Sequence, residues 1–368
     1  MDKLSQIALS MTPGLGPTSI RRLLDVYPGQ DVFELPAMEL YHAFGTHRDV
    51  AEHIVGRTAF GRAEEELRFC ERNGIRVLFC TDDDFPQRLN REDTGDAPVL
   101  LYVKGALDLN RERSVAIVGT RRATPQGRDN THRLVRELIP TGPMVVSGLA
   151  YGIDTAAHSA AVEYGLPTVA VLGHGLDRIY PPSNRRLAIE ILEKGGALVT
   201  EYPNGTAINP RYFPARNRII ASLADATVVV EASAKGGALI TAALATGYHR
   251  EVFAVPGRPT DPYSVGTNNL IATQRALLVR DGDDVAYQMG WPLSGRQATA
   301  AEQQTLFPTL KPEEQCIVDL LRQYGQLPLD EMVAMAAMPM PQVAALLFNL
   351  ELAKVVRVLP GRLYQLVS

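Results

Sequence analysis

Glycine-containing stretches occur at four points in the middle of the chain, each directly after a short apolar run. They lie at residues 119–122, 147–154, 173–175 and 231–238. Glycine lets backbone amides approach a ligand closely, and a helix that begins behind such a loop favours an anion at its N-terminus. Arg121, Arg122 and Lys235 supply formal positive charge. The pattern predicts a phosphate-binding site; the alternative is that the glycines only form sharp turns.

These loops lack the signatures of the common nucleotide-dependent enzymes. A dinucleotide-binding loop would read Gly-x-Gly-x-x-Gly, whereas residues 119–124 read Gly-Thr-Arg-Arg-Ala-Thr. A P-loop requires Gly-Lys followed by Ser or Thr, and the sequence contains no Gly-Lys pair. The Gly-x-Ser-x-Gly turn of a hydrolase is missing as well. The sequence therefore predicts neither catalytic residues nor a bound cofactor.

A second chemical signal lies at residues 211–218, where two aromatic side chains stand among three arginines. Single-stranded nucleic acid is bound by this combination, because bases stack on rings while basic groups and amides follow the backbone. The alternative is structural: an aromatic ring anchors the loop and an arginine pairs with a buried glutamate. The pattern favours DNA contact for Arg211 and Phe213, and it leaves both interpretations open for Asn217 and Arg218.

Residues with metal-ligating side chains do not form a recognisable metal site. Asp154 and His158 are spaced i, i+4, but a metal would need a third ligand that we do not find. We interpret Asp154 as a helix cap and His158 as a packed side chain. The three cysteines are widely spaced and form no Cys-x-x-Cys, which predicts reduced thiols and no zinc.

The charge distribution allows nucleic acid as a ligand although the chain as a whole is acidic. The net charge is −4, yet residues 113–136 contain six arginines and one acidic residue, a local patch that suffices as an electrostatic footprint. No stretch approaches the roughly 18 uncharged apolar residues of a membrane helix. The first residues lack a secretory signal pattern, so we expect a cytoplasmic protein without membrane insertion.

Short apolar runs in the middle of the chain alternate with helical patterns. The predicted strands are residues 114–118, 144–147, 167–172, 196–200, 226–231 and 251–255, and an earlier pair, 76–80 and 98–103, extends the sheet at one edge. Strands that are apolar throughout are buried on both faces, and strand–helix–strand connections give a parallel sheet. We therefore predict an α/β fold, an extended Rossmann-like sheet whose ligand lies at the carboxyl ends of the strands.

The two ends of the chain have a different character. Residues 1–65 have helical patterning, and Gly-x-Gly at 14–16 indicates either a SAM-like, helix-hairpin-helix DNA-binding element or a tight turn. Three helical patterns followed by a hairpin near the other end predict a winged helix. The predicted domains are a helical domain at 1–65, a Rossmann-like DNA-binding domain at 66–290, a linker at 291–310 and a winged-helix domain at 311–368.

Taken in order, the central motifs resemble those of the bacterial DNA-processing protein A (DprA/Smf) family. The matching segments are residues 116–122, 147–158, 172–181, 200–203, 213–218, 235–241, 255–257 and 266–271. The resemblance implies a homodimer that binds and protects incoming single-stranded DNA and helps to load a RecA-type recombinase in natural transformation. Single-strand-binding protein is a further candidate partner. The resemblance puts the phosphates at Arg121, near Gly148 and at 235–237. Thr120 and Ala238 stand where members often have serine, and Ala238 lacks the hydroxyl.

Combining the motifs with the resemblance gives a set of candidate DNA-contacting residues. They are Gly119, Thr120, Arg121, Arg122, Ser147, Gly148, Arg211, Phe213, Arg216, Asn217, Lys235, Gly236 and Gly237. One alternative function is a nucleotide-cleaving enzyme like the lysine-decarboxylase-like phosphoribohydrolases, but residues 234–243 lack the glutamate that such an enzyme needs. Another is a winged-helix transcription regulator. Its third helix, residues 342–352, has no basic residue, which favours protein contact.

Overall fold

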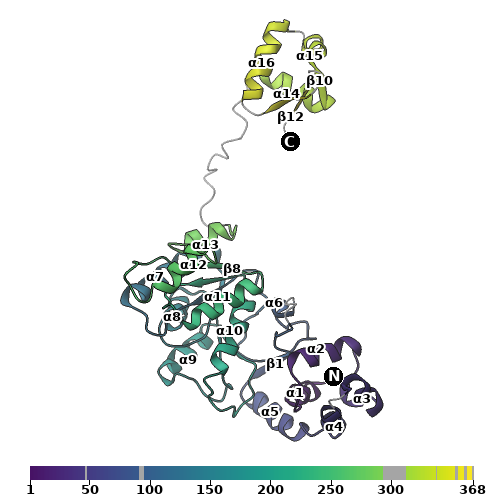
Figure 1. The fold of residues 1–368 in the computed structure, drawn as a ribbon, viewed down its shortest axis with the longest axis vertical. Helices are drawn as coiled ribbons and strands as arrows, with labels where there is room; N and C mark the ends of the chain where they lie inside the picture. The colour runs from purple at the N-terminus through teal and green to yellow at the C-terminus, as the bar shows by residue number, and fades with distance from the viewer. Residues whose placement is uncertain are drawn as a thin grey trace. The chain divides into compact units, whose positions relative to one another are not determined.

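The chain forms two compact units, Met1–Leu293 and Ser294–Ser368, drawn as a ribbon in Figure 1. The computed structural model describes residues 1–45, 48–90, 95–292, 312–336, 338–352, 355–359 and 363–366. Apart from its first two residues, the predicted linker lies outside these ranges. Each unit has a hydrophobic core of its own.

The larger unit is built around a sheet to which the described residues contribute nine strands, in the order β1-β2-β6-β5-β4-β3-β7-β8-β9. They are β1 Ile75–Phe79, β2 Leu100–Lys104, β3 Ser114–Val118, β4 Met144–Ser147, β5 Thr168–Val171, β6 Ala197–Thr200, β7 Ala226–Val229, β8 Glu251–Ala254 and β9 Leu277–Leu278. Neighbouring strands from β6 to β9 are parallel, whereas β1 and β2 run antiparallel at one end. The predicted parallel sheet with an added strand pair is confirmed.

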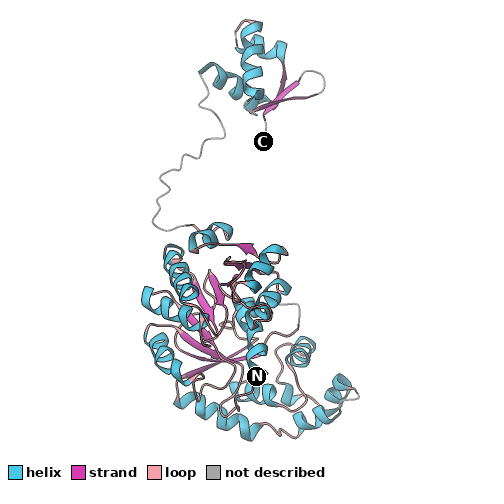
Figure 2. Cartoon of the chain, turned by 60° about the vertical axis from the view of Figure 1, so that its left-hand side comes forward, coloured by secondary structure: helices cyan, strands magenta, loops and turns pink. Residues whose placement is uncertain are grey.

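Helices cover both faces of this sheet, as Figure 2 shows. Successive residues of a strand point to opposite faces, and because these strands are largely apolar, both faces need covering. Val115 and Ile117 of β3 share a core with α7 and α8, whereas Ala116 and Val118 share a core with Ile219 of α10. The helices of the central region are α6 Gln87–Asn90, α7 Pro125–Glu137, α8 Ile153–Tyr164, α9 Arg185–Glu193, α10 Tyr212–Leu223, α11 Gly237–Gly247, α12 Val265–Ala272 and α13 Gly282–Gln288, with short 3-10 turns at Ile139–Thr141 and Pro182–Asn184. The α/β fold class is confirmed.

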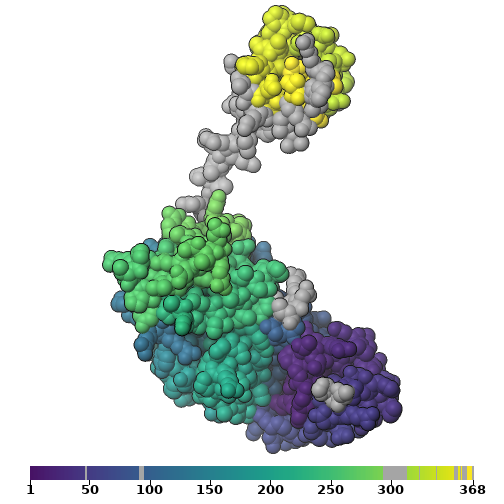
Figure 3. All heavy atoms as spheres, viewed as in Figure 1, coloured from purple at the N-terminus to yellow at the C-terminus, as the bar shows by residue number. Residues whose placement is uncertain are grey.

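The predicted helical N-terminal region is also confirmed, and its surface joins that of the central region in Figure 3. It comprises α1 Lys3–Met11, α2 Pro17–Val26, a 3-10 turn at Val32–Glu34, α3 Ala37–Phe44, α4 Arg48–Val55 and α5 Phe60–Arg72. At the start of α2, Thr18 Oγ1 donates to the Gly95 carbonyl at 2.7 Å and Arg21 Nη2 donates to the Pro98 carbonyl at 2.9 Å. These contacts favour the tight-turn interpretation of the Gly-x-Gly motif. The predicted boundary at residue 65 falls inside α5.

The smaller unit has the winged-helix arrangement predicted for it. Its elements are α14 Pro312–Tyr324, β10 Gln326–Pro328, α15 Leu329–Ala336, α16 Met340–Leu352, β11 Val356–Leu359 and β12 Leu363–Leu366. The three strands pair antiparallel in the order β10-β12-β11, and Ile317, Met332 and Val343 lie in the core. Across the described residues of the whole chain, no single helix has the length and apolarity to cross a membrane; the bent pair α15–α16 meets the criterion on length and composition alone.

Candidate nucleic-acid interface

The chain order of the strands creates a switch point at β3. From β3 the chain adds β4, β5 and β6 on one side, and it then returns to add β7 and β8 on the other side. In open parallel sheets the ligand site lies outside the carboxyl ends of the strands at such a point. A cavity of about 200 Å³ is found here, lined by Val118, Gly119, Thr120, Arg121, Ala150, Asp154, Phe213, Pro214, Arg216, Asn217, Ile220, Gly236, Gly237, Ala238, Ile240 and Thr241.

The loop after β3 is packed so closely against the loop after β4 that side chains are excluded between them. Gly152 has a φ of 80°, and a Cβ there would overlap the carbonyl oxygen of Thr120. The backbone N–H of Ile153 donates to the same carbonyl at 3.2 Å. Glycine at position 152 is therefore required by both conformation and space. The contact fixes the backbone that carries Arg121 to the cavity.

Glu231, two residues after the end of β7, fixes the other side of this loop. Its Oε2 accepts the backbone N–H of Thr124 at 3.0 Å, and its Oε1 accepts the Thr124 hydroxyl at 2.5 Å. Its carbonyl accepts the backbone N–H of Thr120 at 2.8 Å. Because Thr124 is the N-cap of α7, this one buried acid ties a strand, a loop and a helix start together.

A buried acid and a buried arginine form the floor of the cavity. Asp154 Oδ2 accepts the backbone N–H groups of Gly148 and Ala150, at 3.1 and 3.4 Å. Arg216, 3% exposed, donates from Nη1 to the Gly148 carbonyl at 2.7 Å and also to the Val171 carbonyl. A Cβ on Gly148 would collide with the Arg216 guanidinium. Both polar backbone groups of Gly148 are thus committed to protein partners.

The electrostatic character of the site is positive. Burial raises the pKa of Asp154, against the opposing influence of Arg216 and the two backbone N–H groups. Burial lowers the pKa of Arg216 to about 10, which leaves the guanidinium protonated at neutral pH. Asp154 acts in the opposite direction, because its charge favours the protonated guanidinium. Four cations on the segments around the cavity have no ion-pair partner within the described ranges: Arg121, which lines the cavity, and the exposed Arg122, Arg211 and Lys235.

An aromatic ring stands beside the cationic rim. The guanidinium carbon of Arg121 lies 5.5 Å from the centroid of the Phe213 ring, a cation–π distance. The ring of Tyr180 approaches Phe213 at a centroid distance of 5.5 Å. Two residues of α10 differ in their surroundings. Phe213 lines the cavity, whereas Arg218 forms an ion pair with Glu201 at 2.6 Å. That ion pair supports the structural interpretation of Arg218.

The N-terminus of α11 supplies backbone donors to the same cavity. Gly236 is the N-cap, and no side chain hydrogen-bonds back to cap this helix start. A Cβ on Gly237 would meet no atom within 4 Å, so the glycine is not demanded by packing. Helix N-termini with free amides attract anions. The exposed Lys235 precedes them directly.

The structure brings most of the candidate DNA-contacting residues together. Eight of them line the cavity: Gly119, Thr120, Arg121, Phe213, Arg216, Asn217, Gly236 and Gly237. Arg122 and Lys235 are exposed next to lining residues, and Arg211 is exposed at the N-cap of α10. Ser147 and Gly148 lie behind the cavity; Ser147 is buried and donates its hydroxyl to the Ile117 carbonyl at 2.7 Å.

The interpretation of Asp154 as a helix cap is wrong: no side chain that the structure describes caps the start of α8, and Asp154 instead accepts the N–H groups of Gly148 and Ala150 in the preceding loop. Sequence reasoning also missed the part of Glu231 in holding the site. The available signal was an acid at the end of a strand or in the first helical turn after it. His158 is fully buried; its Nδ1 lies 2.8 Å from Thr168 Oγ1, and burial lowers its pKa to about 3. Among the residues that the structure describes, no group of three or more His, Cys, Asp or Glu side chains could hold a metal ion.

Comparison with known proteins gives a consistent result. The profile of the family described as DNA recombination-mediator protein A matches residues 76–290, and that of the DprA winged helix domain matches residues 298–362. Protein Smf of Synechocystis sp. is 33% identical over 98% of this chain and 97% of its own length. The X-ray structure of DNA processing protein A from Streptococcus pneumoniae has a TM-score of 0.69 at 34% identity, covering 78% of this chain and 98% of that one.

A second solved structure, DNA processing protein A from Helicobacter pylori, is described for its single-stranded DNA binding mode. It has a TM-score of 0.52 at 30% identity, covering 58% of this chain and 95% of its own. Fold and site together define a class: a Rossmann-like protein with a cavity between glycine-containing loops at the switch point, and with a winged-helix unit. The chain belongs to the DNA recombination-mediator protein A (DprA/Smf) family. The resemblance found in its motifs is confirmed.

Proposed function

We propose that this recombination mediator binds single-stranded DNA at the cavity between the loop after β3 and the start of α10. The observation that carries the proposal is the pairing of Arg121 with Phe213 at the rim of a cavity whose other side is the N-terminus of α11. A phosphate would meet Arg121 and the backbone amide of Gly237, while a base stacks on the phenyl ring; the amide of Gly236 already donates to the Ser233 carbonyl. The Helicobacter pylori relative, described for single-stranded DNA binding, supports this proposal.

The candidate residues would contribute in different ways. We assign direct phosphate contact to Arg121, with Arg122, Arg211 and Lys235 extending the cationic track. We assign a supporting part to the residues whose polar atoms are already used within the protein, namely Ser147, Gly148 and Arg216. The DNA is then bound by charge and stacking rather than by reading base edges, so its sequence would matter little.

We propose further that the protein acts without catalysis. Asp154 is the only carboxylate among the lining side chains, and it accepts two backbone N–H groups beside a buried guanidinium. A base that is so engaged is poorly suited to take a proton from a substrate. Incubation with ATP or with nucleoside monophosphates should release neither phosphate nor base, and turnover proportional to protein concentration would contradict this.

Binding is tested by fluorescence anisotropy with a labelled oligothymidylate and a blunt duplex of equal length. We expect tighter binding to the single strand, with a dissociation constant that rises steeply with salt. Equal or tighter binding to the duplex at the same salt would contradict the proposal.

The role in recombination is tested separately. We propose that a homodimer in the cytoplasm helps to load a RecA-type recombinase onto DNA coated with single-strand-binding protein, during DNA uptake. The protein should then shorten the lag of filament assembly on coated strands. An unchanged lag in the presence of protein that binds single strands would leave a DNA-binding protein without the loading function.

A further inference from the structure

The segment that brings the aromatic residues to the cavity is an extended loop, residues 201–211, between β6 and α10. Its two ends are fixed close to the site: Glu201 pairs with Arg218 at 2.6 Å, and the Tyr202 ring stacks on that of Tyr212 at a centroid distance of 4.5 Å. Beyond these two contacts the loop pairs with no described strand, and its residues are half-buried or exposed. Something else must set its path.

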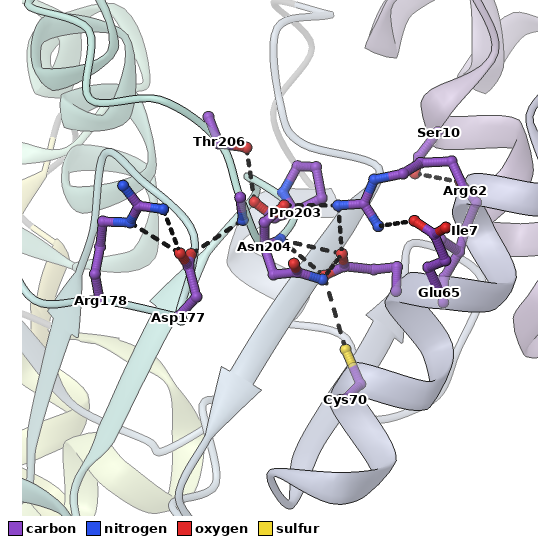
Figure 4. Close-up of polar contacts among 12 residues, drawn as sticks. Ile7, Ser10, Arg62, Glu65, Cys70, Asp177, Arg178, Pro203, Asn204 and Thr206 are labelled. Carbon is purple, nitrogen blue, oxygen red and sulfur yellow. Dashed lines mark hydrogen bonds and ion pairs between the residues drawn. The ribbon is translucent and has the colours of Figure 1, made fainter.

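The middle of the loop is held from the helical N-terminal region. Glu66 of α5 accepts the backbone N–H of Asn204 at 3.0 Å, and it also accepts the Asn204 side-chain amide. Arg62, one helical turn earlier, donates to the Asn204 carbonyl at 2.6 Å and to Glu66 at 3.0 Å. Figure 4 shows Arg62 reaching from its helix to Asn204. Both backbone groups and the side chain of one loop residue are thus bound by a single turn of α5.

The contact buries the charged side chain of Glu66, and this burial costs free energy that only hydrogen bonds can offset. Glu66 is 1% exposed, and burial raises the pKa of its carboxyl group against the effects of Asn204 and Arg62. Burying a carboxylate is unfavourable unless it is fully hydrogen-bonded. Beside the contact, Arg62 and Pro203 border a cavity of about 610 Å³ instead of a packed core. The hydrogen bonds of Glu66 and Arg62 therefore hold the loop on the side of α5, while on its other side Asp177 Oδ1 accepts the backbone N–H of Gly205 at 3.2 Å.

We propose that Glu66 is a positioning residue of the DNA-binding site. By holding Asn204 it sets the path of residues 201–211 and hence the place of Tyr212 and Phe213 at the start of α10. The helical region would thereby control DNA affinity without touching DNA. The proposal rests on the proposed binding of single-stranded DNA at this site.

The test compares Glu66→Ala with Glu65→Ala in the full-length protein, using anisotropy with labelled oligothymidylate. Glu65 is the neighbouring acid, 71% exposed and 3.9 Å from Arg62, so it controls for loss of charge. We expect Glu66→Ala to raise the dissociation constant about threefold to thirtyfold, the range for residues that act at a distance. Glu65→Ala should leave it unchanged.

The salt dependence separates positioning from direct contact. Since Glu66 would touch no phosphate, the slope of log Kd against log salt should equal that of the wild type, whereas loss of Arg121 should reduce it. Glu66→Gln, which keeps acceptor and size, should recover part of the affinity. A folded Glu66→Ala protein with wild-type affinity would overturn the proposal, as would an altered salt slope.

Two outcomes remain distinct by design. If the wild type itself does not bind the oligonucleotide, the proposed function fails and not merely the positioning role. If Glu66→Ala does not fold, the double variant Arg62→Ala/Asn204→Ala takes its place, because it removes both side-chain donors of the contact, the Arg62 guanidinium and the Asn204 amide. Unchanged affinity in that folded double variant would then overturn the positioning role.

Discussion

Three arginines of the candidate interface differ in burial and in the partners of their guanidinium groups. Arg121 has no ion-pair partner in the described part of the chain and lies over the Phe213 ring. Arg216 is buried and donates to backbone carbonyls, and Arg218 pairs with Glu201. Charge alone therefore does not identify a DNA contact. What matters is whether the guanidinium is free to exchange water for phosphate.

Replacing Arg121 tests this distinction at a single residue. Arg121→Ala should weaken single-strand binding by roughly 1–3 kcal/mol, the range for losing a charge-assisted contact. The melting temperature should be unchanged, because the Arg121 side chain makes no hydrogen bond or ion pair with the residues that the structure describes. Arg68→Ala serves as the control, since the Arg68 side chain on α5 is 67% exposed and forms a surface ion pair with Glu64. Equal losses in both variants would mean that only net charge matters.

The buried His158 predicts how stability depends on pH. Its pKa in the folded protein is about 3, below the ordinary value of 6.5, so the imidazole stays neutral inside while the unfolded chain takes up a proton below pH 6.5. The contribution of His158 to the free energy of unfolding is therefore complete above pH 6.5, and it is lost progressively as the pH falls towards 3. Between pH 7 and pH 5 the loss should be about 2 kcal/mol.

Denaturant unfolding of the wild type and His158→Gln at both pH values checks this. The variant should lose less stability between pH 7 and pH 5, because its side chain does not titrate. The second buried imidazole, His174, also has a lowered pKa, but it is present in both proteins and cancels in the comparison. Parallel pH profiles would contradict the assignment.

At the scale of elements, the site depends on where strands end and helices begin. The apolar runs predicted the strands because buried parallel strands need no polar face. The predicted strand at 144–147 is β4, and that at 251–255 contains β8. The convergence of Arg121 and Phe213 follows only from the order of strands in the sheet. No local pattern predicts a buried arginine such as Arg216, because arginine is rarely buried and its partners are distant carbonyls.

The N-terminus of α11 can be tested with two glycines of one helix. A Cβ on either Gly237 or Gly247 would meet no atom within 4 Å. Alanine at both positions should therefore leave the melting temperature unchanged or raise it slightly, since alanine favours helix. If a phosphate lies against the first turn, Gly237→Ala should weaken binding about tenfold, or about 1.4 kcal/mol. Gly247→Ala should bind like the wild type, and equal binding by both would place the strand elsewhere.

For the whole molecule, the compact unit Met1–Leu293 contains every residue of the cavity and of the Glu66 contact. A chain that ends at residue 293 should therefore bind single-stranded DNA with the affinity of the full chain. Anisotropy on the shortened protein measures this directly. A large loss would give the winged helix a part in DNA binding, although α16 has no basic residue.

The proposed homodimer would join two such cavities on one strand. Two linked sites raise affinity only when both can be occupied at once, so a dimer should bind long oligonucleotides more tightly than short ones. Light scattering should report about twice the chain mass of 40.2 kDa. A monomer at micromolar concentration, with affinity independent of oligonucleotide length, would contradict the dimer.

The central claim is that a single strand lies on the rim formed by Arg121, Phe213 and the start of α11. Photo-crosslinking to a bromodeoxyuridine-substituted oligonucleotide, followed by mass spectrometry of the modified peptides, tests it most directly. We predict that the modified residues lie in the segment around Tyr212 and Phe213, and that Arg121→Ala reduces their yield. Crosslinks confined to the N-terminal helices or to the winged helix would contradict the claim.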